Sequence, residues 1–311
     1  QNVNNGGKTT STTVNSSGAQ NVGNSGIAIS TIVNSGGIQR VSSGGVTSAT
    51  NLSGGAQNIY NLGHASNTVI FSGGNQTILS GGISYHTNIS SGGQQRVSSG
   101  GTASNTTING SGVQNILSGG SAVSTHISAG GTQNVSSGGN ASDTVVNTSG
   151  FQRVSAGGTA TGTRLSGGTQ NVSSGGKASA TEVYSGGKQN IYADGIASGT
   201  SINQSGYVNI SSGGYAESTI INGGGTQSVL SNGRASGTMI NNSGRENVSN
   251  GGASYNTIIH DGGNQYIYSN GEATGATVSS GGFQRVSAGG TATGTRLSGG
   301  TQNVSSGGSA I

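Results

Sequence analysis

Acidic, basic and imidazole side chains are few in this chain and do not gather in one part of the sequence. Enzymes that use acid–base chemistry need clustered carboxylates, imidazoles or amines, usually supported by long loops. The seven carboxylates are Asp143, Glu182, Asp194, Glu217, Glu246, Asp261 and Glu272, and the four histidines are His64, His86, His126 and His260. None has the spacing of a catalytic triad or of a metal site. We therefore expect no enzyme activity, no metal and no cofactor.

Three of these carboxylates have a simpler explanation. Glu246, beside Arg245, stands where comparable parts of the chain have Gln, so we interpret it as a substituted member of a side-chain ladder and not as an acid catalyst. Asp194 and Asp261 each precede a Gly and are typical of single turns. The repeated Asp of the calcium-binding nonapeptides is absent from the sequence.

The rest of the chain is built from one phrase of about 19 residues. Residues 151–176 return letter for letter as residues 283–308. We number each repeat from an anchor, usually Gln, and the anchors are Gln1, Gln20, Gln39, Gln57, Gln76, Gln95, Gln114, Gln133, Gln152, Gln170, Gln189, Val208, Gln227, Glu246, Gln265, Gln284 and Gln302. A fixed period of this kind is the signature of a stacked repeat architecture.

Particular slots of the repeat hardly vary. The second residue after the anchor is Val or Ile, the sixth is Gly in all seventeen repeats, and the eighth is small. The eleventh is Thr in every complete repeat except one, which has Ala276. Three steps between anchors are 18 residues long, and each is shortened at the same place, in NLSGG or RLSGG, which predicts a loop there.

The phrases Gln-x-Val and Thr-x-Ile have the period of two that is typical of strands with one buried face. Ser-Gly-Gly or Asn-Gly closes each short run, and Gly permits the positive φ of a sharp corner. Identical slots favour parallel stacking of successive coils, and parallel crossovers are right-handed. The sequence predicts an all-β fold, a right-handed parallel β-helix, with two to three short strands per rung and a single repeat array over residues 1–311.

Alternation also predicts which side chains face inward. We expect the aliphatic, Ala and Thr columns inside, with Thr hydroxyls and some Gln amides forming ladders. Inward Thr argues against ice binding, which needs outward Thr. Arg40, Arg96, Arg153 and Arg285 share an outward slot but are too sparse for nucleic-acid binding, so we expect no nucleic-acid partner.

Composition agrees with this picture. A chain with 64 Gly and 6% charged residues resembles a disordered segment, but fixed Val and Ile columns argue against disorder. The lack of Cys suits a chain that crosses an oxidising compartment. No signal peptide or apolar run of transmembrane length is present, and both ends fall inside a repeat, so we expect a fragment of a longer protein.

Two phrases carry a family resemblance. SGGTQNVSSGG at Ser166–Gly176 and SSGGTASNTTI at Ser98–Ile108 closely resemble the 19-residue repeats of self-associating autotransporter adhesins of the AIDA and TibA type. The resemblance spans the whole chain. It implies a signal peptide before this segment and a translocating β-barrel after it, neither of which is present here. It further implies transit through the periplasm to the outer membrane, with this passenger domain exposed on the bacterial cell surface.

The resemblance also implies chemistry and partners. Members of this group are O-heptosylated on Ser and Thr by a cytoplasmic heptosyltransferase, so we expect covalently attached heptose. Ser before a Gly-Gly or Asn-Gly corner is a turn residue, but corners project furthest into solvent, where a transferase can reach them. The predicted O-glycosylation sites are Ser43, Ser53, Ser72, Ser80, Ser91, Ser99, Ser118, Ser137, Ser166, Ser174, Ser185, Ser212, Ser231, Ser280, Ser298 and Ser306.

We therefore predict an adhesin passenger that mediates autoaggregation, biofilm formation and host-cell attachment, and thereby contributes to virulence. Its partners are passengers on neighbouring cells, the heptosyltransferase and a host-cell receptor that the sequence does not identify. The alternative is a passive structural stalk that presents a distal binding domain.

Overall fold

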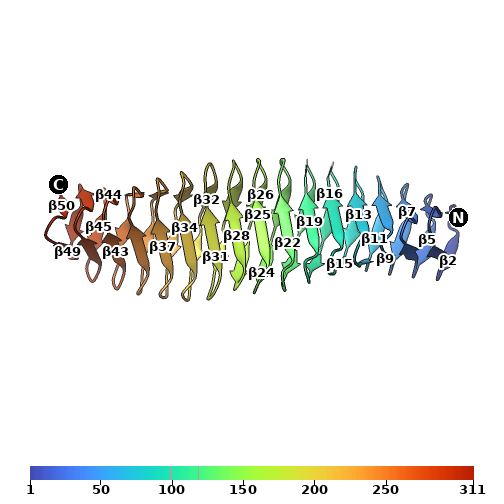
Figure 1. Ribbon diagram of the computed structural model, residues 1–311, viewed down its shortest axis with the longest axis horizontal. Coiled ribbons are helices and arrows are strands. Elements are labelled where there is room, and N and C mark those ends of the chain that lie inside the picture. Colours follow the sequence, from blue (N-terminus) through green and yellow to red (C-terminus); the bar gives the residue numbers. More distant parts are fainter. Residues whose placement is uncertain (99, 118) are drawn as a thin grey trace. The chain divides into compact units, whose positions relative to one another are not determined.

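The computed structural model describes residues 1–98, 100–117 and 119–311, and these form strands and turns without any helix. The chain divides into two compact units, one of residues 1–153 with 157–160 and one of residues 154–156 with 161–311. Within each unit every repeat makes one coil, which we call a rung, and each complete rung has three strands (Figure 1). The prediction of an all-β solenoid is confirmed, at the upper end of the predicted strand number.

The first strand of each rung, the A strand, begins just before the anchor, or just after it in the first rung, and ends at the Val or Ile two residues after it. The A strands are β1 (Asn2–Val3), β4 (Ala19–Val22), β7 (Ile38–Val41), β10 (Ala56–Ile59), β13 (Asn75–Ile78), β16 (Gln94–Val97), β19 (Val113–Ile116), β22 (Thr132–Val135), β25 (Phe151–Val154), β28 (Thr169–Val172), β31 (Lys188–Ile191), β34 (Tyr207–Ile210), β37 (Thr226–Val229), β40 (Arg245–Val248), β43 (Asn264–Ile267), β46 (Phe283–Val286) and β49 (Thr301–Val304).

The second strand, the B strand, is centred on the small residue of the eighth slot. The B strands are β2 (Lys8–Thr10), β5 (Ile27–Ile29), β8 (Val46–Ser48), β11 (His64–Ser66), β14 (Ile83–Tyr85), β17 (Thr102–Ser104), β20 (Ser121–Val123), β23 (Asn140–Ser142), β26 (Thr159–Thr161), β29 (Lys177–Ser179), β32 (Ile196–Ser198), β35 (Tyr215–Glu217), β38 (Arg234–Ser236), β41 (Ala253–Tyr255), β44 (Glu272–Thr274), β47 (Thr291–Thr293) and β50 (Ser309–Ala310).

The third strand, the C strand, follows the Thr of the eleventh slot. The C strands are β3 (Thr13–Val14), β6 (Ile32–Asn34), β9 (Asn51–Ser53), β12 (Val69–Ile70), β15 (Asn88–Ile89), β18 (Thr107–Ile108), β21 (His126–Ile127), β24 (Val145–Asn147), β27 (Arg164–Ser166), β30 (Glu182–Val183), β33 (Ser201–Ile202), β36 (Ile220–Ile221), β39 (Met239–Ile240), β42 (Ile258–Ile259), β45 (Thr277–Ser279) and β48 (Arg296–Ser298). The shortened 18-residue repeats are trimmed between C and A strands, as predicted.

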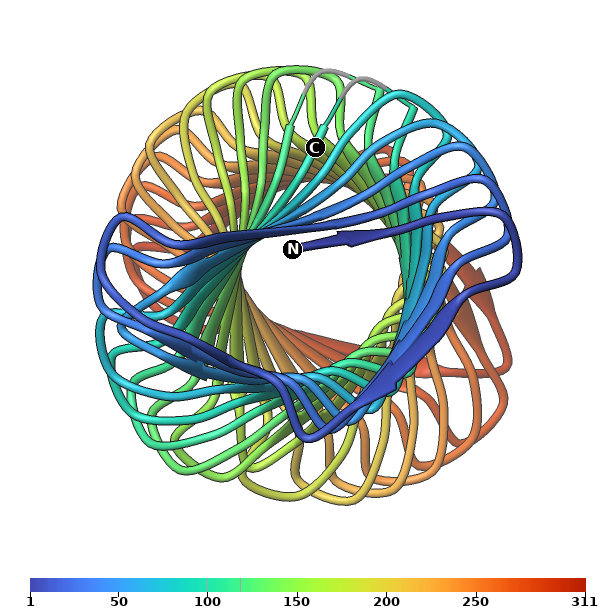
Figure 2. The same cartoon turned by 90° about the vertical axis from the view of Figure 1, so that its right-hand side faces the viewer.

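Successive rungs within a unit pair in parallel and in register. Gln57 of β10 lies opposite Gln76 of β13, and Ile59 lies opposite Ile78. Each slot therefore stacks on the same slot of the next rung. Seen end-on, the blue coils of the first unit lie over one another with their corners pointing outward (Figure 2).

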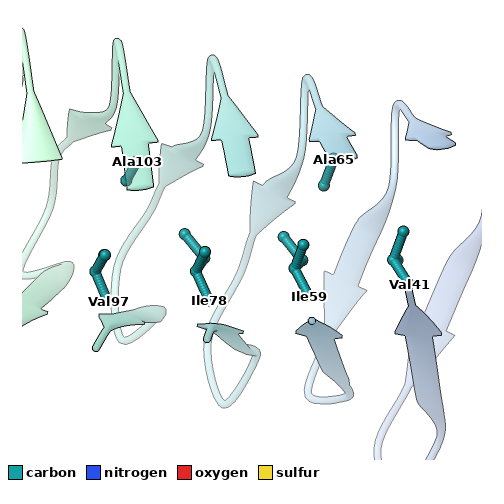
Figure 3. Packing of buried hydrophobic residues seen from close by; sticks show 6 residues of the cluster. All are labelled: Val41, Ile59, Ala65, Ile78, Val97 and Ala103. Atoms are coloured by element: carbon teal, nitrogen blue, oxygen red, sulfur yellow. The ribbon is translucent and has the colours of Figure 1, made fainter. Parts of the chain in front are cut away.

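The aliphatic slots fill the interior. Val41, Ile59, Ile78 and Val97 form one column from four successive A strands, and Ala65 and Ala103 lie in the B strands facing it (Figure 3). All are at most 1% exposed. Burying a Val or Ile side chain stabilises by about 1.5–3 kcal/mol, and the small B-strand residue leaves room for the larger side chains of the A and C strands.

A second interior column consists of glutamine amides. The anchors from Gln20 to Gln133 are fully buried, and each anchor Nε2 from Gln20 to Gln152 donates to Oε1 of the anchor before it at 2.6–2.8 Å. The predicted glutamine ladder is confirmed. The Thr hydroxyls act differently from the prediction. Among the described residues most of them donate to the anchor of their own rung, as Thr31 Oγ1 does to Gln20 Oε1 at 3.1 Å.

The invariant Gly of the sixth slot has a reason that differs from the predicted one. Gly101 does not have a positive φ, and a Cβ at this residue would lie 2.5 Å from the backbone oxygen of Ile78 in the preceding rung. The corner residue with positive φ is its neighbour Gly100, at +78°, where a Cβ would meet nothing within 4 Å. The invariant Gly therefore permits close stacking of rungs, and the Gly before it forms the turn.

We predict that Gly101→Ala destabilises the chain more than Gly100→Ala. The first change forces apart the backbones of two rungs and should cost about 2–3 kcal/mol, as overpacking does. The second adds only the strain of a left-handed Ala, about 1–2 kcal/mol. Urea unfolding monitored by far-UV circular dichroism measures both, and equal losses would contradict this assignment of the two glycines.

Candidate functional site

The corner between A and B strands is a tight turn. At Ser42–Gly45 the Gly45 amide donates to the Ser42 carbonyl at 2.8 Å, and both central residues have positive φ, 51° at Ser43 and 76° at Gly44. These values are those of a type I′ turn. Ser43 and Gly44 also donate their amides to Asn61 and Leu62 of the next rung, at 3.0 and 2.9 Å. Corners therefore stack on corners, with their side chains pointing outward.

The structure places the predicted serines at these corners or at the C–A corners. The exposed ones are Ser43, Ser53, Ser72, Ser80, Ser91, Ser137, Ser174, Ser185, Ser212, Ser231, Ser280, Ser298 and Ser306, whereas Ser166 is half-buried. Ser99 and Ser118 lie outside the described residues. Ser53, Ser166 and Ser298 are the last residues of C strands in the three shortened repeats, and the others stand in turns.

Registered stacking brings these hydroxyls into rows. Ser53, Ser72 and Ser91 occupy C–A corners of successive rungs in the first unit, and the Ser72 Oγ would lie 3.0 Å from a Cβ on Gly92 of the next rung. The Ser72 side chain therefore lies against Gly92, which stands next to Ser91 in the corner above. An enzyme that modifies one exposed corner hydroxyl therefore finds a similar corner one rung away.

The sequence analysis missed a third set of corner hydroxyls, between B and C strands. Ser11, Ser30, Ser124 and Ser218 have φ of 54–56° there, and the Ser11 amide donates to the Ile29 carbonyl at 2.9 Å. The tenth slot could have revealed them, because it carries only Ser, Asn, Asp, His, Ala or Gly. Most of these residues tolerate the left-handed conformation.

The acids and histidines form no metal cluster in the part of the chain that the structure describes. One acid, one base and one phenol meet on the outward face of the second unit. Arg164 lies over the Tyr184 ring at 4.4 Å, and Tyr184 donates to Glu182 Oε2 at 3.0 Å. This hydrogen bond raises the pKa of the Tyr184 phenol above its usual 10.0 and keeps it neutral. The cluster is open to solvent on a flat strand face, which does not suit catalysis.

Glu246 is fully buried in the glutamine column, as its interpretation as a ladder member requires. It accepts hydrogen bonds from Gln227 Nε2 at 2.9 Å, from Gln265 Nε2 at 2.7 Å, and from Ser254 and Thr257 at 3.0 Å each. The two carboxylate oxygens accept these bonds, so Glu246 draws donors from both neighbouring rungs.

This carboxylate reverses the direction of the amide ladder. Gln265 and Gln284 donate toward the N-terminus, as the anchor amides from Gln20 to Gln152 do, but Gln227 donates toward the C-terminus. Gln227 thereby turns its Oε1 toward Val208, the one apolar anchor. Gln227 Oε1 and Thr219 Oγ1 are buried without a partner. Val208 lies between Gln227 Oε1 and the Oε1 end of Gln189, whose Nε2 donates to the anchor before it at 2.7 Å, and a Gln amide at this position has only one donor end for the two oxygens.

No helix in the described residues is long and apolar enough to cross a membrane. The geometry is that of a regular β-solenoid with an apolar and amide-lined interior and corners rich in hydroxyls, which defines a structural repeat protein.

Comparisons with known proteins agree. A family model described as "Adhesin of bacterial autotransporter system, probable stalk" (AIDA) matches residues 59–112, 80–131, 111–169, 193–244 and 247–301. The chain belongs to this family of adhesin stalks, which confirms the predicted relationship and the prediction that it is not an enzyme.

A solved structure provides a second comparison. The crystal structure of a TibC-catalysed, hyper-glycosylated TibA fragment, residues 55–350, is similar to this chain with 37% sequence identity and a TM-score of 0.69. The match covers 98% of this chain and 99% of that one. No curated protein sequence matches. This chain is therefore an adhesin passenger of the autotransporter type.

We predict that Glu246→Gln stabilises the chain. A Gln at this position can donate to Gln227 Oε1, and the Gln227 amide can then turn and donate to Thr219. Two orphaned buried groups gain partners, so the free energy of unfolding should rise by about 1–3 kcal/mol, measured by urea titration.

Gln76→Glu is the matched control, because its rung also carries Ser and Thr bonded to the anchor and a Gln anchor above, Ser84, Thr87 and Gln95. A carboxylate at Gln76 faces the Oε1 of Gln57. No anchor before Gln76 is apolar, so reversing the ladder would bring two amide oxygens together. We expect a loss of about 3 kcal/mol or more. Shifts of the same sign in the two variants would contradict the directional ladder.

Proposed function

We propose that this passenger is O-glycosylated at its corner hydroxyls by a heptosyltransferase and causes bacteria to aggregate, form biofilm and attach to host cells. The rows of exposed corner serines are the observation that carries this proposal. The comparison with a hyper-glycosylated fragment at 37% identity supports it, because a chain with the same kind of rungs is a glycosyltransferase substrate.

Backbone strain at the corners gives independent support. Ser43, Ser80, Ser137, Ser174, Ser212 and Ser231 have φ of 40–54°, where Gly is favoured sterically. A left-handed non-Gly residue costs about 1–2 kcal/mol relative to Gly. Strained residues cluster where function requires a particular side chain. A hydroxyl to which a sugar is attached gives such a reason for Ser in place of Gly.

Self-association fits the outward surface. Only 6% of residues are charged, so like faces repel one another weakly. Each rung presents a similar set of hydroxyl and amide groups, and many weak contacts along aligned faces sum to avidity. We propose that passengers on neighbouring cells bind one another in this way.

Family membership supports placing this passenger on the cell surface of a bacterium with an outer membrane, after passage through the periplasm, which we propose as its location. That residues 1–311 form a single array, part of a longer autotransporter, stays a prediction. A host-cell receptor remains part of the proposal without a chemical identity.

The second candidate function is a passive stalk that holds a distal binding domain away from the cell. The description of the family as a probable stalk favours it specifically. Stalk and adhesive surface differ in one property, because only the adhesive surface binds a second copy of itself.

Coexpression with the heptosyltransferase should increase the intact mass of this chain, with sugars mapped to exposed corner hydroxyls. Ser43→Ala, Ser137→Ala and Ser174→Ala should each lose the sugar at that residue, whereas Ser84→Ala, at a buried hydroxyl, should leave the sugar count unchanged. An unchanged mass, or sugar confined to inward strand Thr, would rule out the proposed sites.

Beads coated with the glycosylated chain should clump when mixed, and beads coated with heat-denatured chain should not. Clumping is read by light scattering. If folded, glycosylated chain gives no more clumping than the denatured control, the passive stalk is the better description.

A further inference from the structure

A cavity of about 270 Å³ opens on the outward face of the B strands in the second unit. Its lining includes Arg234, Ala253 and Glu272 from β38, β41 and β44, Tyr255 from β41, and Asn232 from an A–B corner. None of these residues takes part in the interior columns. The interior and the corner hydroxyls therefore do not account for this notch.

The notch arises from one small residue in an outward column. The seventh slot after the anchor carries seventeen residues in this chain, and Ala253 is the only alanine among them. It lies between Arg234 and Glu272 in the parallel register. Ala forms the floor, and the two long side chains form opposite walls.

The two wall side chains, Arg234 and Glu272, each carry a charge that no other side chain of the described residues neutralises. Their backbone amides bond to the preceding rung, but neither side chain forms a hydrogen bond or an ion pair within the described part of the chain, and both are exposed. The two residues are two rungs apart, so their backbones are separated by about 10 Å. The guanidinium donates only and the carboxylate accepts only, and the space between them is open.

The remaining two lining side chains complete the site. Tyr255 is half-buried and stands two residues after the Ala floor, on the same face. Asn232 has a φ of 63° in its turn, and its amide N–H bonds to the Gly251 carbonyl at 3.2 Å, which holds the corner in place. The notch thus offers an aromatic ring, an amide, a donor wall and an acceptor wall.

We propose that this notch binds a neutral saccharide ring. A sugar hydroxyl both donates and accepts, so one ring can satisfy Arg234 and Glu272 together, while its C–H face packs on Tyr255. A simple anion is disfavoured by Glu272 and a simple cation by Arg234. The charged groups of an α-amino acid are too close together to reach both walls. The volume lies just below the usual range of small-molecule sites, which suits one ring.

The first unit contains a natural control. Tyr85 occupies the same slot as Tyr255, but the floor position beside it is Ile83 and the flanking residues are His64 and Thr102. Tyr85 is 41% exposed, so it offers a ring without a notch or charged walls. A ring that binds sugars nonspecifically would behave alike at both sites.

Saturation-transfer NMR with the unmodified chain and a panel of methyl glycosides of neutral hexoses and heptoses tests the site. At least one glycoside should receive saturation. Ala253→Leu, which fills the notch as Ile83 does in its slot, and Glu272→Thr should each weaken binding by about tenfold or more. Tyr85→Ala should leave it unchanged. Circular dichroism verifies that each variant is folded.

Two sources can supply such a ring, namely a glycan on a second copy of this chain or an oligosaccharide on another cell. Adding glycosylated chain as competitor distinguishes them, since displacement of the bound glycoside identifies the chain's own glycan as a ligand. The absence of saturation for every glycoside, or equal binding by Ala253→Leu and the wild-type chain, would overturn the proposal. The proposed glycosylation could fail without affecting this result.

Discussion

Hydrogen bonding between stacked anchor amides is the constraint on which the rest of the structure depends. A buried amide without a partner costs about 1–3 kcal/mol, so each anchor must lie directly over the one before it. In the first unit eight such bonds of 2.6–2.8 Å follow one another. This register places Val over Val inside and corner over corner outside. A one-residue slip would turn every side chain to the other face.

The column also has a direction, which apolar cores lack. Each amide has a donor end and an acceptor end, so changing one anchor affects its neighbours. Glu246 accepts hydrogen bonds from the anchors on both sides, so the direction of the ladder reverses there. Val208 lies between the two anchor oxygens that face each other as a result. The two exceptions among the anchors therefore belong together, although they are 38 residues apart in the sequence. At outward slots the side-chain bonds between rungs, such as that from Asn134 Nδ2 to Asn115 Oδ1 at 2.9 Å, are not continuous, so the repeat tolerates variety there and carries its charges, rings and corner hydroxyls there.

Much of this could be predicted from the sequence, because the period and the alternation determine which slots are buried. Gln95, Val97, Ala103 and Thr106 were all assigned to their faces correctly by these patterns. The reason for the invariant Gly could not be predicted, since it depends on an approach to the carbonyl of another rung. The ladder direction depends on amide orientation, and the notch at Ala253 depends on three rungs considered together. Periodicity describes the average rung, whereas these features arise at individual rungs.

Side-chain amide hydrogen exchange tests the central claim most directly. The Nε2 protons of Gln57, Gln76, Gln95 and Gln114 can be followed by ¹⁵N-resolved NMR after transfer to deuterated water. If stacked amides hold the rungs in register, these protons exchange as slowly as the backbone amides of the A strands. Exchange at the rate of a solvent-exposed Gln side chain, in a chain whose backbone amides remain protected, would contradict the account.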